Sequence, residues 1–344
     1  MRFAVAGTRW GQTHLRWLTD CEAARVSTLC YRSDAERARE IADQWKVPRI
    51  SDDVPAVLAN GDVDALAVAV PPDAREDLLN AGLDAGVLVV TDKPLAHDAA
   101  TAARLAERAR ASTGRAVVCF QWRGNPALRA LRDLCAGGEL GTVFTVDLEF
   151  QHDFMAGDAT RWRWRHHRAA GGAGALADLG VHMFDVLRWM LPGNWGVESA
   201  RALITAPKRT LTDGEIVDCE SEDIADVGLI DSGTARRARV FVSRVCTGYR
   251  TIRVAVQGTA ATAVVEADPN GGAATLTLCA GPDARRETRT FPGDAMNPYD
   301  RILAETAAGP AAWDMAGFDD GLAAQLLLEE ALRRGADSPL VVTR

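Results

Sequence analysis

Three side chains that can transfer a proton or stabilise a negatively charged oxygen stand at positions whose spacing suggests a catalytic site. Asp178 and His182 are four residues apart, and side chains at this spacing lie on one face of a helix. A histidine beside an acid can be oriented for proton transfer. Lys93 directly follows the apolar stretch 87–90, and a lysine that leaves a buried strand can polarise an oxygen or relay a proton. These patterns predict catalytic roles for Lys93, Asp178 and His182.

Each signal also has a purely structural interpretation. A single histidine on a helix is more often part of the packing, and a lysine after a strand is usually solvated. Asp185 continues the stripe of Asp178 and His182, and such spacing would also fit half of a metal site. Because no second cluster of His or Cys stands at ligand spacing, we predict no metal.

The first half of the chain alternates strand-like and helix-like stretches. The strand-like stretches are residues 3–6, 26–30, 64–70, 87–90 and 116–120, and the helix-like ones are 11–20, 34–45, 73–85 and 98–112. Residues 65–70 are apolar on both faces, as expected for a central parallel strand that helices cover. Alternation with short connections predicts an α/β fold with a doubly wound parallel sheet, the Rossmann arrangement.

The pattern changes after residue 141. Residues 142–151 are strand-like, 175–190 are helix-like, 225–256 form successive strands, and 319–334 form an apolar-rich helix. Between 251 and 256 apolar and polar residues alternate, which is typical of an antiparallel sheet with one less buried face. We therefore predict a Rossmann domain over residues 1–121 and, over 122–344, a second α/β domain with a large open, mainly antiparallel sheet.

A glycine turn, Gly7-Thr8-Arg9-Trp10-Gly11, stands where the first strand meets the first helix. A dinucleotide pyrophosphate rests on backbone N–H groups at such a turn, although Arg9 occupies the place of the usual second glycine. The second strand ends at Arg32-Ser33, with no acid before Asp34. A basic residue and a hydroxyl favour NADP(H) over NAD(H). The alternative is that Arg32 is only solvated and Asp34 caps the next helix.

These features together resemble the glucose–fructose oxidoreductase / inositol dehydrogenase / rhizopine catabolism protein (Gfo/Idh/MocA) family. The likeness covers nearly the whole chain, and the ordered combination carries it rather than any single motif. Its motifs are the glycine turn, Pro71-Pro72, Asp92-Lys93-Pro94 for the family's Glu-Lys-Pro, Arg123-Gly124-Asn125-Pro126 for its Arg-x-x-Pro, Trp164-Arg165, and 172–182 for its Gly-Gly-Gly…Asp-x-Gly-x-His.

The resemblance implies hydride transfer on a Rossmann domain, with Lys93, Asp178 and His182 in the site and an open C-terminal sheet often used for oligomerisation. Together with Arg32 and Ser33 at the end of the second strand, the predicted cofactor-binding residues are Gly7, Thr8, Arg9, Trp10, Gly11, Pro71, Lys93 and Arg123. The residues it implies for the substrate are Trp164, Arg165 and Asp178.

Several residues depart from the family pattern. Arg9 and Ala173 replace glycines, Asp92 replaces a glutamate, and Arg75 stands where many members carry a histidine. The glycine turn also resembles that of the thiazolinyl imine reductase branch, which works on carrier-bound siderophore intermediates and usually lacks the lysine kept here as Lys93.

The predicted function is therefore an NAD(P)-dependent oxidoreductase that transfers hydride between nicotinamide and an alcohol or ketone carbon. The substrate would be a sugar, a nucleotide-sugar or a cyclitol-like compound. One alternative is an NADPH-dependent reductase of a C=N bond in natural-product biosynthesis, and a second is a nucleotide-binding regulator without turnover. Retention of Lys93, Asp178 and His182 together speaks against the second alternative.

Composition limits the partners. The chain has 344 residues, and 39 Lys+Arg against 47 Asp+Glu give a formal net charge of −8, which argues against nucleic acid. The basic, aromatic stretch 161–168 is one loop that could pack structurally or meet an anionic substrate. No apolar run approaches the about 18 residues that a membrane span needs. Seven cysteines without a CxxC pair indicate a reducing compartment, so we expect a cytoplasmic homodimer or homotetramer formed through the C-terminal sheet.

Overall fold

The computed structural model describes residues 1–156, 174–211, 213–281, 283, 285–293, 297–309, 313–336 and 340–341. The chain forms two compact units, the first comprising Met1–Gln121 and Asn297–Gln325 and the second Trp122–Met296 and Leu326–Arg344. The two-segment division drawn from the sequence assigned residues 297–325 to the second domain. They belong to the first because Tyr299, Ile302 and Leu303 pack into its hydrophobic core.

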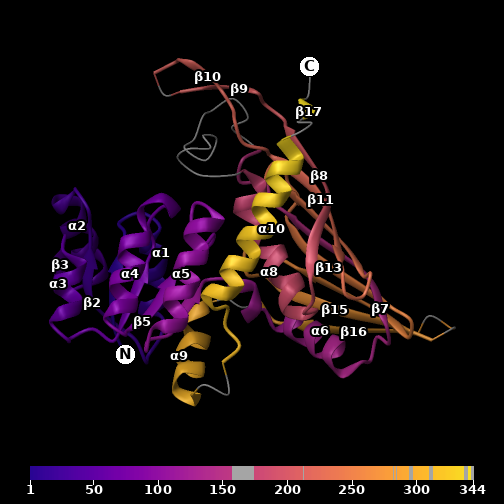
Figure 1. Ribbon diagram of the computed structural model, residues 1–344, viewed down its shortest axis with the longest axis horizontal. Helices are drawn as coiled ribbons and strands as arrows, with labels where there is room; N and C mark the ends of the chain where they lie inside the picture. The colour runs from indigo at the N-terminus through magenta and orange to yellow at the C-terminus, as the bar shows by residue number, and fades with distance from the viewer. Residues whose placement is uncertain are drawn as a thin grey trace. The chain divides into compact units, whose positions relative to one another are not determined.

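The first unit is built on a six-stranded parallel sheet in the order β3-β2-β1-β4-β5-β6 (Figure 1). Its strands are β1 (Arg2–Ala6), β2 (Arg25–Cys30), β3 (Arg49–Ser51), β4 (Ala65–Val68), β5 (Leu88–Thr91) and β6 (Ala116–Val118). Every residue of β4 and β5 is buried, as the apolar composition predicts for central strands. This strand order confirms the predicted Rossmann sheet.

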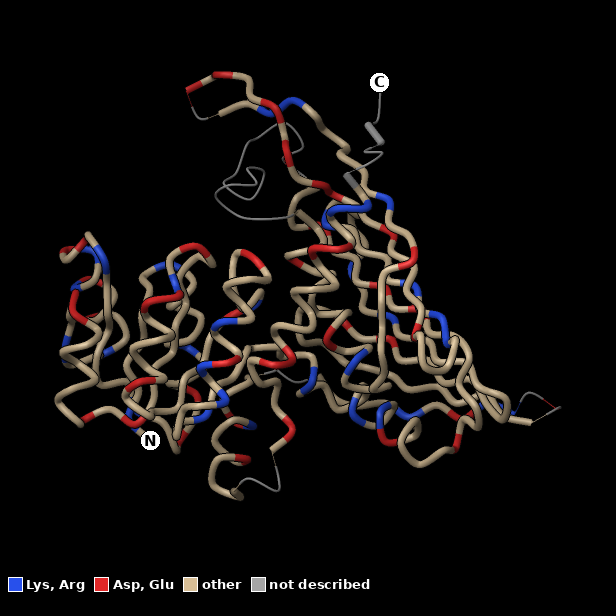
Figure 2. The backbone as a smooth tube through the Cα atoms, viewed as in Figure 1, with Lys and Arg blue, Asp and Glu red and all other residues tan. Residues whose placement is uncertain are grey.

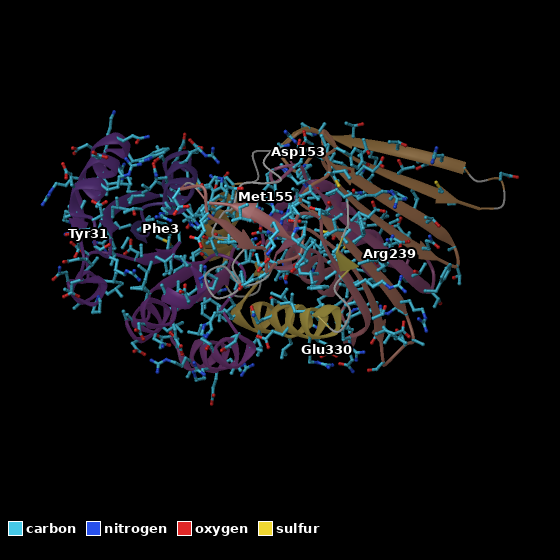
Figure 3. The ribbon with its side chains drawn as sticks, turned by 90° about the horizontal axis from the view of Figure 1, so that it is seen from above. Phe3, Tyr31, Asp153, Met155, Arg239 and Glu330 are labelled. Atoms are coloured by element: carbon cyan, nitrogen blue, oxygen red, sulfur yellow. The ribbon has the colours of Figure 1, made fainter. Side chains whose placement is uncertain are left out.

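Helices connect the strands of this sheet, namely α1 (Gly11–Thr19), α2 (Ala35–Trp45), α3 (Val54–Ala59), α4 (Glu76–Asp84) and α5 (Ala99–Ala111). The later helix α9 (Pro298–Ala308) also belongs to this unit. The side chains of Asp34, Asp53 and Asp98 accept hydrogen bonds at the starts of α2, α3 and α5. The expected helix 73–85 is divided into a 3-10 turn, Pro72–Ala74, and α4. Phe3 of β1, labelled in Figure 3, is fully buried in the first unit.

The second unit contains a nine-stranded mixed sheet in the order β16-β15-β14-β13-β7-β12-β11-β8-β17. Only β7 with β12 and β8 with β17 are parallel among its neighbouring pairs, so the predicted mainly antiparallel sheet is confirmed. Its strands are β7 (Val143–Gln151), β8 (Trp195–Ile204), β11 (Ile224–Asp231), β12 (Arg237–Ser243), β13 (Thr251–Gly258), β14 (Ala261–Ala267), β15 (Ala274–Ala280), β16 (Arg285–Phe291) and β17 (Leu340–Val341). A small sheet pairs β9 (Lys208–Thr210) with β10 (Ile216–Asp218).

One face of the large sheet packs against α6 (Pro126–Gly137) and α8 (Val181–Met190) (Figure 1). Along β7, Val146, Leu148 and Phe150 are buried and alternate with partly exposed residues. The other face carries charged pairs, such as Arg239 with Asp226, so red and blue alternate along these strands in Figure 2. The sheet is therefore apolar on its helical face and charged on the other.

A 3-10 turn, Gln121–Gly124, precedes α6, and α10 (Phe318–Ala336) has residues in both units. Where the sequence predicts one helix over 175–190, the structure has a π-helical turn, Leu176–Gly180, that continues into α8. Across the described part of the chain, no helix is both long and apolar enough to span a bilayer.

Candidate active site

The glycine turn leaves β1 at a point where a side chain would not fit. Gly7 has φ +124°, and a Cβ atom there would lie 2.5 Å from the carbonyl oxygen of Ala69. Its N–H donates to the carbonyl of Cys30 at 3.0 Å, which ties the turn to the end of β2. The residue before α1, Trp10, provides no side-chain cap, so the N–H groups at this helix start are not capped by it. Only glycine allows this close approach.

The end of β2 is open to solvent. Arg32 and Ser33 are exposed, and Asp34 begins the next helix because its Oδ1 accepts from the N–H of Arg37 at 2.9 Å. The acid nearest to the strand end therefore caps α2. Pro71, the other predicted cofactor contact in this unit, follows β4 and is exposed.

The loop that carries Lys93 is fixed by a buried arginine. Lys93 is half-buried and follows β5. Arg75, only 2% exposed, donates from Nη1 to the carbonyls of Asp92 at 2.5 Å and Pro94 at 2.6 Å. Its Nη2 donates to the carbonyl of Val70 at 2.6 Å. One guanidinium thus holds the main chain on both sides of Lys93 and connects it to the end of β4. Arg75, which stands where many family members carry a histidine, therefore holds the loop of Lys93 in place.

A second set of contacts holds the Asp92 side chain. His14 Nε2 lies 3.1 Å from both carboxylate oxygens, and His14 Nδ1 lies 2.6 Å from the Tyr299 hydroxyl. Burial works to raise the pKa of Asp92, but His14 and Arg75 outweigh it and leave this pKa below its ordinary value. Sequence reasoning missed His14 and Tyr299, because no local spacing reveals a partner 285 residues away.

Asp178 and His182 lie on one continuous helical segment of the second unit. Asp178 is in the π-helical turn, with its N–H donating to the carbonyl of Gly174 at 3.0 Å. His182 is on the first turn of α8 and is 3% exposed, with its ring centroid 6.3 Å from that of Phe150 on β7. π-helical turns occur often at functional sites, because they displace side chains from the regular helical register.

A buried charge cluster lies beside Asp178. Arg244, which follows β12, is fully buried, and its Nη1 lies 3.6 Å from Asp178 Oδ2. Its Nε donates to Asp223 Oδ1 at 3.1 Å, and its Nη2 donates to Ser221 Oγ at 3.0 Å. Arg209 donates to both oxygens of Asp223, at 3.1 and 3.0 Å. Burial opposes ionisation of Asp223, but Thr205, Arg244 and Arg209 together lower its pKa.

Glu222 fixes the start of the π-helical turn. Its Oε1 accepts from the N–H of Leu176 and its carbonyl from the N–H of Ala175, both at 2.9 Å. A Cβ atom on Gly174 would lie 1.8 Å from that carbonyl oxygen, so glycine is required there. Burial raises the pKa of Glu222. The sequence motif revealed the glycines but not the loop that they contact.

Arg123 and Asp185 form a buried pair. The guanidinium donates from Nε at 2.9 Å and from Nη2 at 2.5 Å to the two carboxylate oxygens. The carboxylate of Asp185 therefore binds Arg123. The sequence pattern had predicted that Asp185 shares one helix face with Asp178 and His182. The cofactor role of Arg123 stays a prediction.

The remaining predicted residues lie outside the described ranges. These are Trp164 and Arg165, together with the stretch 161–168 and residues 172–173 of the glycine motif.

The predicted site residues fall into two groups. Gly7, Arg32, Pro71 and Lys93 follow β1, β2, β4 and β5, so they share the carboxyl edge of the parallel sheet, where such folds bind ligands. Asp178, His182 and Arg123 belong to the second unit. Within the described ranges, no group of three or more His, Cys, Asp or Glu is arranged to hold a metal ion.

Comparison with known families covers both units of the chain. Residues 1–120 match the oxidoreductase family with an NAD-binding Rossmann fold, and residues 128–264 match the GFO/IDH/MocA C-terminal domain. The chain belongs to the Gfo/Idh/MocA family. It is accordingly a member of an oxidoreductase family with an NAD-binding Rossmann fold, and the family that the sequence motifs predicted is confirmed.

Individual Gfo/Idh/MocA relatives are distant. Inositol 2-dehydrogenase 3 of Saccharopolyspora erythraea is 26% identical over 329 residues, which cover 91% of this chain and 88% of that protein. An uncharacterized oxidoreductase of Synechocystis sp. is 28% identical over 188 residues, 54% of this chain, and the chain spans about half of that protein's length, 50%. A structure of levoglucosan dehydrogenase with NADH and L-sorbose has a TM-score of 0.85 at 18% identity, with 98% and 97% of the chains covered. This likeness shows the fold.

Proposed function

We propose that the chain transfers hydride between a nicotinamide cofactor and an alcohol or ketone carbon of a sugar, nucleotide-sugar or cyclitol-like substrate. The observation that carries this proposal is the buried segment with Asp178 and His182, one helical turn apart, in a chain of this family. The names of two relatives, an inositol 2-dehydrogenase and a levoglucosan dehydrogenase, support a polyhydroxylated substrate.

Three residues have distinct roles in the oxidation direction. When bound, the nicotinamide accepts the hydride. His182 takes the proton from the substrate hydroxyl, and Asp178 orients the imidazole or binds a neighbouring hydroxyl. Lys93 stabilises the charge that develops on the substrate oxygen and shares the proton relay. In the reduction direction the same groups return the proton to the oxygen.

The residues of the glycine turn fit a dinucleotide. Gly7 leaves no room for a Cβ atom, and no side chain caps the start of α1, where the N–H groups of Gln12 and Thr13 donate to main-chain carbonyls. Both features suit a pyrophosphate held by main-chain donors. We further propose that NADP(H) is preferred, with NAD(H) as the alternative. Arg32 and Ser33 are exposed at the end of β2, and the carboxylate of Asp34 caps α2.

Replacing Arg32 tests this preference. Arg32→Ala should weaken NADPH binding about 10- to 100-fold, since hydrogen bonds between charged groups contribute about 1.5–3 kcal/mol, and leave NADH binding unchanged. Quenching of intrinsic fluorescence measures both affinities. Arg108→Ala is the control, because Arg108 is exposed and pairs with Asp84 on α4. An unaltered NADPH preference in Arg32→Ala would reject the role of Arg32.

Turnover itself is tested with a substrate panel. Polyols, keto-sugars, nucleotide-sugars and cyclic imines are mixed with the chain and NADP(H) or NAD(H), and the absorbance of reduced nicotinamide is followed. We expect turnover with a polyol or a keto compound and a loss of about 10²–10⁴-fold in His182→Ala, with cofactor affinity retained. His97→Ala is the control, since His97 is exposed. Reduction of an imine alone would instead identify a C=N reductase, and no turnover at all would favour a nucleotide-binding regulator.

We also propose that copies of the chain associate through the charged face of the nine-stranded sheet, as a homodimer or homotetramer. On this face Arg237 pairs with Glu198 and Arg239 with Asp226, so exposed charges of both signs lie side by side on the surface that a second copy would cover. Sedimentation equilibrium gives the molar mass directly, and a monomer at micromolar concentration would contradict the proposal.

A further inference from the structure

We propose that Arg244 is a positioning residue that holds Asp178 as an oriented carboxylate during the reaction. This inference rests on the proposed function, because it assigns a task to a residue that acts through Asp178. Arg244 has no place in any motif that the sequence revealed, and it stands more than sixty positions after Asp178 in the chain.

The guanidinium of Arg244 is fixed by two of its three nitrogens. Nε donates to Asp223 and Nη2 to Ser221, and the Arg244 carbonyl accepts from the N–H of Met155, a residue labelled in Figure 3. The third nitrogen, Nη1, is buried without a hydrogen-bond partner in the described part of the chain. That nitrogen faces Asp178 Oδ2 at 3.6 Å. A fixed donor is therefore aimed at one oxygen of Asp178.

The distance of 3.6 Å makes the contact electrostatic, since a hydrogen bond would be shorter. Such contacts in catalytic sites often tighten when the substrate is bound. A guanidinium this close favours the ionised form of a carboxyl group. Arg244 shares Asp223 with Arg209, so two buried cations face that one carboxylate, and Asp178 provides Arg244 with a second anion.

An ionised Asp178 has a use in the proposed chemistry. It stands one helical turn before His182, and a carboxylate near a histidine stabilises the imidazolium that forms when the ring takes a proton. Among the described residues, Asp223 and Arg209 are joined to Asp178 through Arg244, and Glu222 holds the start of the same π-helical turn. Removal of Arg244 should therefore leave the Asp178 carboxylate without its fixed partner and weaken its support of His182.

The experiment compares wild type, Arg244→Met and Arg244→Lys in the full chain. The first readout is carboxyl NMR of 13C-labelled aspartate, with the Asp178 signal assigned by its loss in Asp178→Asn. The second is the pH profile of kcat with the best panel substrate. The control is Arg334→Met, because Arg334 is exposed in the same unit and pairs with Glu330, labelled in Figure 3. Circular dichroism checks that each variant folds.

In Arg244→Met we expect the chemical shift of the Asp178 carboxyl signal to change and kcat to fall about 10- to 100-fold, since charge stabilisation contributes on this scale. The acidic limb of the kcat profile should move upward, and the cofactor affinity should stay unchanged. Arg244→Lys should restore part of the Asp178 chemical shift, and it also keeps a test available should Arg244→Met not fold. A merely structural role would reduce kcat without moving the limb.

An unchanged chemical shift of the Asp178 carboxyl signal in both variants would overturn the proposal. It would also be overturned by an equal loss of kcat from Arg244→Met in the Asp178→Asn background, because Arg244 would then act elsewhere. If wild type turns over no panel compound, the proposed function fails. The NMR measurement needs no turnover and still decides whether Arg244 acts on Asp178.

Discussion

The loop of Lys93 and the turn of Asp178 are each held by a buried arginine, but in different ways. Arg75 donates to three main-chain carbonyls, two of which flank Lys93. Arg244 instead contacts side chains, namely the carboxylates of Asp223 and Asp178 and the hydroxyl of Ser221. The first arrangement fixes where the main chain runs, and the second places a buried cation beside the carboxylate of Asp178.

Loss of Arg75 and loss of Arg244 should therefore affect different properties of the protein. Main-chain carbonyls have no alternative protonation state, so loss of Arg75 leaves unsatisfied acceptors and a displaced loop. Carboxylates can take up a proton, so loss of Arg244 changes ionisation as well as packing. Arg75 variants should therefore be judged by unfolding, and Arg244 variants by titration.

The largest expected effect is on Arg75. Arg75→Met should lower the free energy of unfolding by about 3–5 kcal/mol, because three buried carbonyls lose their donor at about 1–3 kcal/mol each, with partial relaxation. Urea denaturation followed by circular dichroism measures it. Arg108→Met, which removes an exposed pair, should cost at most about 1 kcal/mol. Equal losses in the two variants would remove the structural role given to Arg75.

A smaller effect should follow from adding one methyl group beside the π-helical turn that carries Asp178. Gly174→Ala would place a Cβ atom 1.8 Å from the carbonyl oxygen of Glu222, so the π-helical turn must shift. We expect a loss of about 1–3 kcal/mol in unfolding free energy and reduced kcat. Gly196→Ala on β8 is the control, because nothing lies within 4 Å of its added Cβ. A neutral Gly174→Ala would show that this turn adapts freely.

The smallest effect concerns acid stability of the first unit. The pKa of Asp92 is below its ordinary value of 3.8, so its ionised form stabilises the fold above that pH and this contribution is lost as pH falls further. Asp92→Asn should cost about 1 kcal/mol at pH 7, comparable with one hydrogen bond. In urea denaturation at a series of pH values, the difference in unfolding free energy between Asp92→Asn and wild type should shrink below pH 4. A difference that grows on acidification would contradict a stabilising role of ionised Asp92.

The sequence was sufficient for the two sheets and for the family. Fully apolar strands with short connections specify a parallel sheet, and alternating strands specify an antiparallel one. The sequence could not show that Tyr299 and Ile302 return to the first unit, since periodicity reveals a buried face but not which core covers it. The π-helical turn has no distinct sequence pattern. The contacts of Arg75 with the loop of Lys93 and of Arg244 with Asp178 were equally hidden, because residues distant in the sequence make them.

The central claim is that Lys93 and His182 serve one reaction, and a double-mutant cycle on kcat/KM tests it most directly. Lys93→Met and His182→Ala should each lower kcat/KM by about 10²–10⁴-fold. The kcat/KM of the double variant should be within about tenfold of that of the less active single variant, because the effects of residues that act in the same step are not additive. A double variant whose loss equals the product of the two single losses would show that they act independently, and would contradict the account.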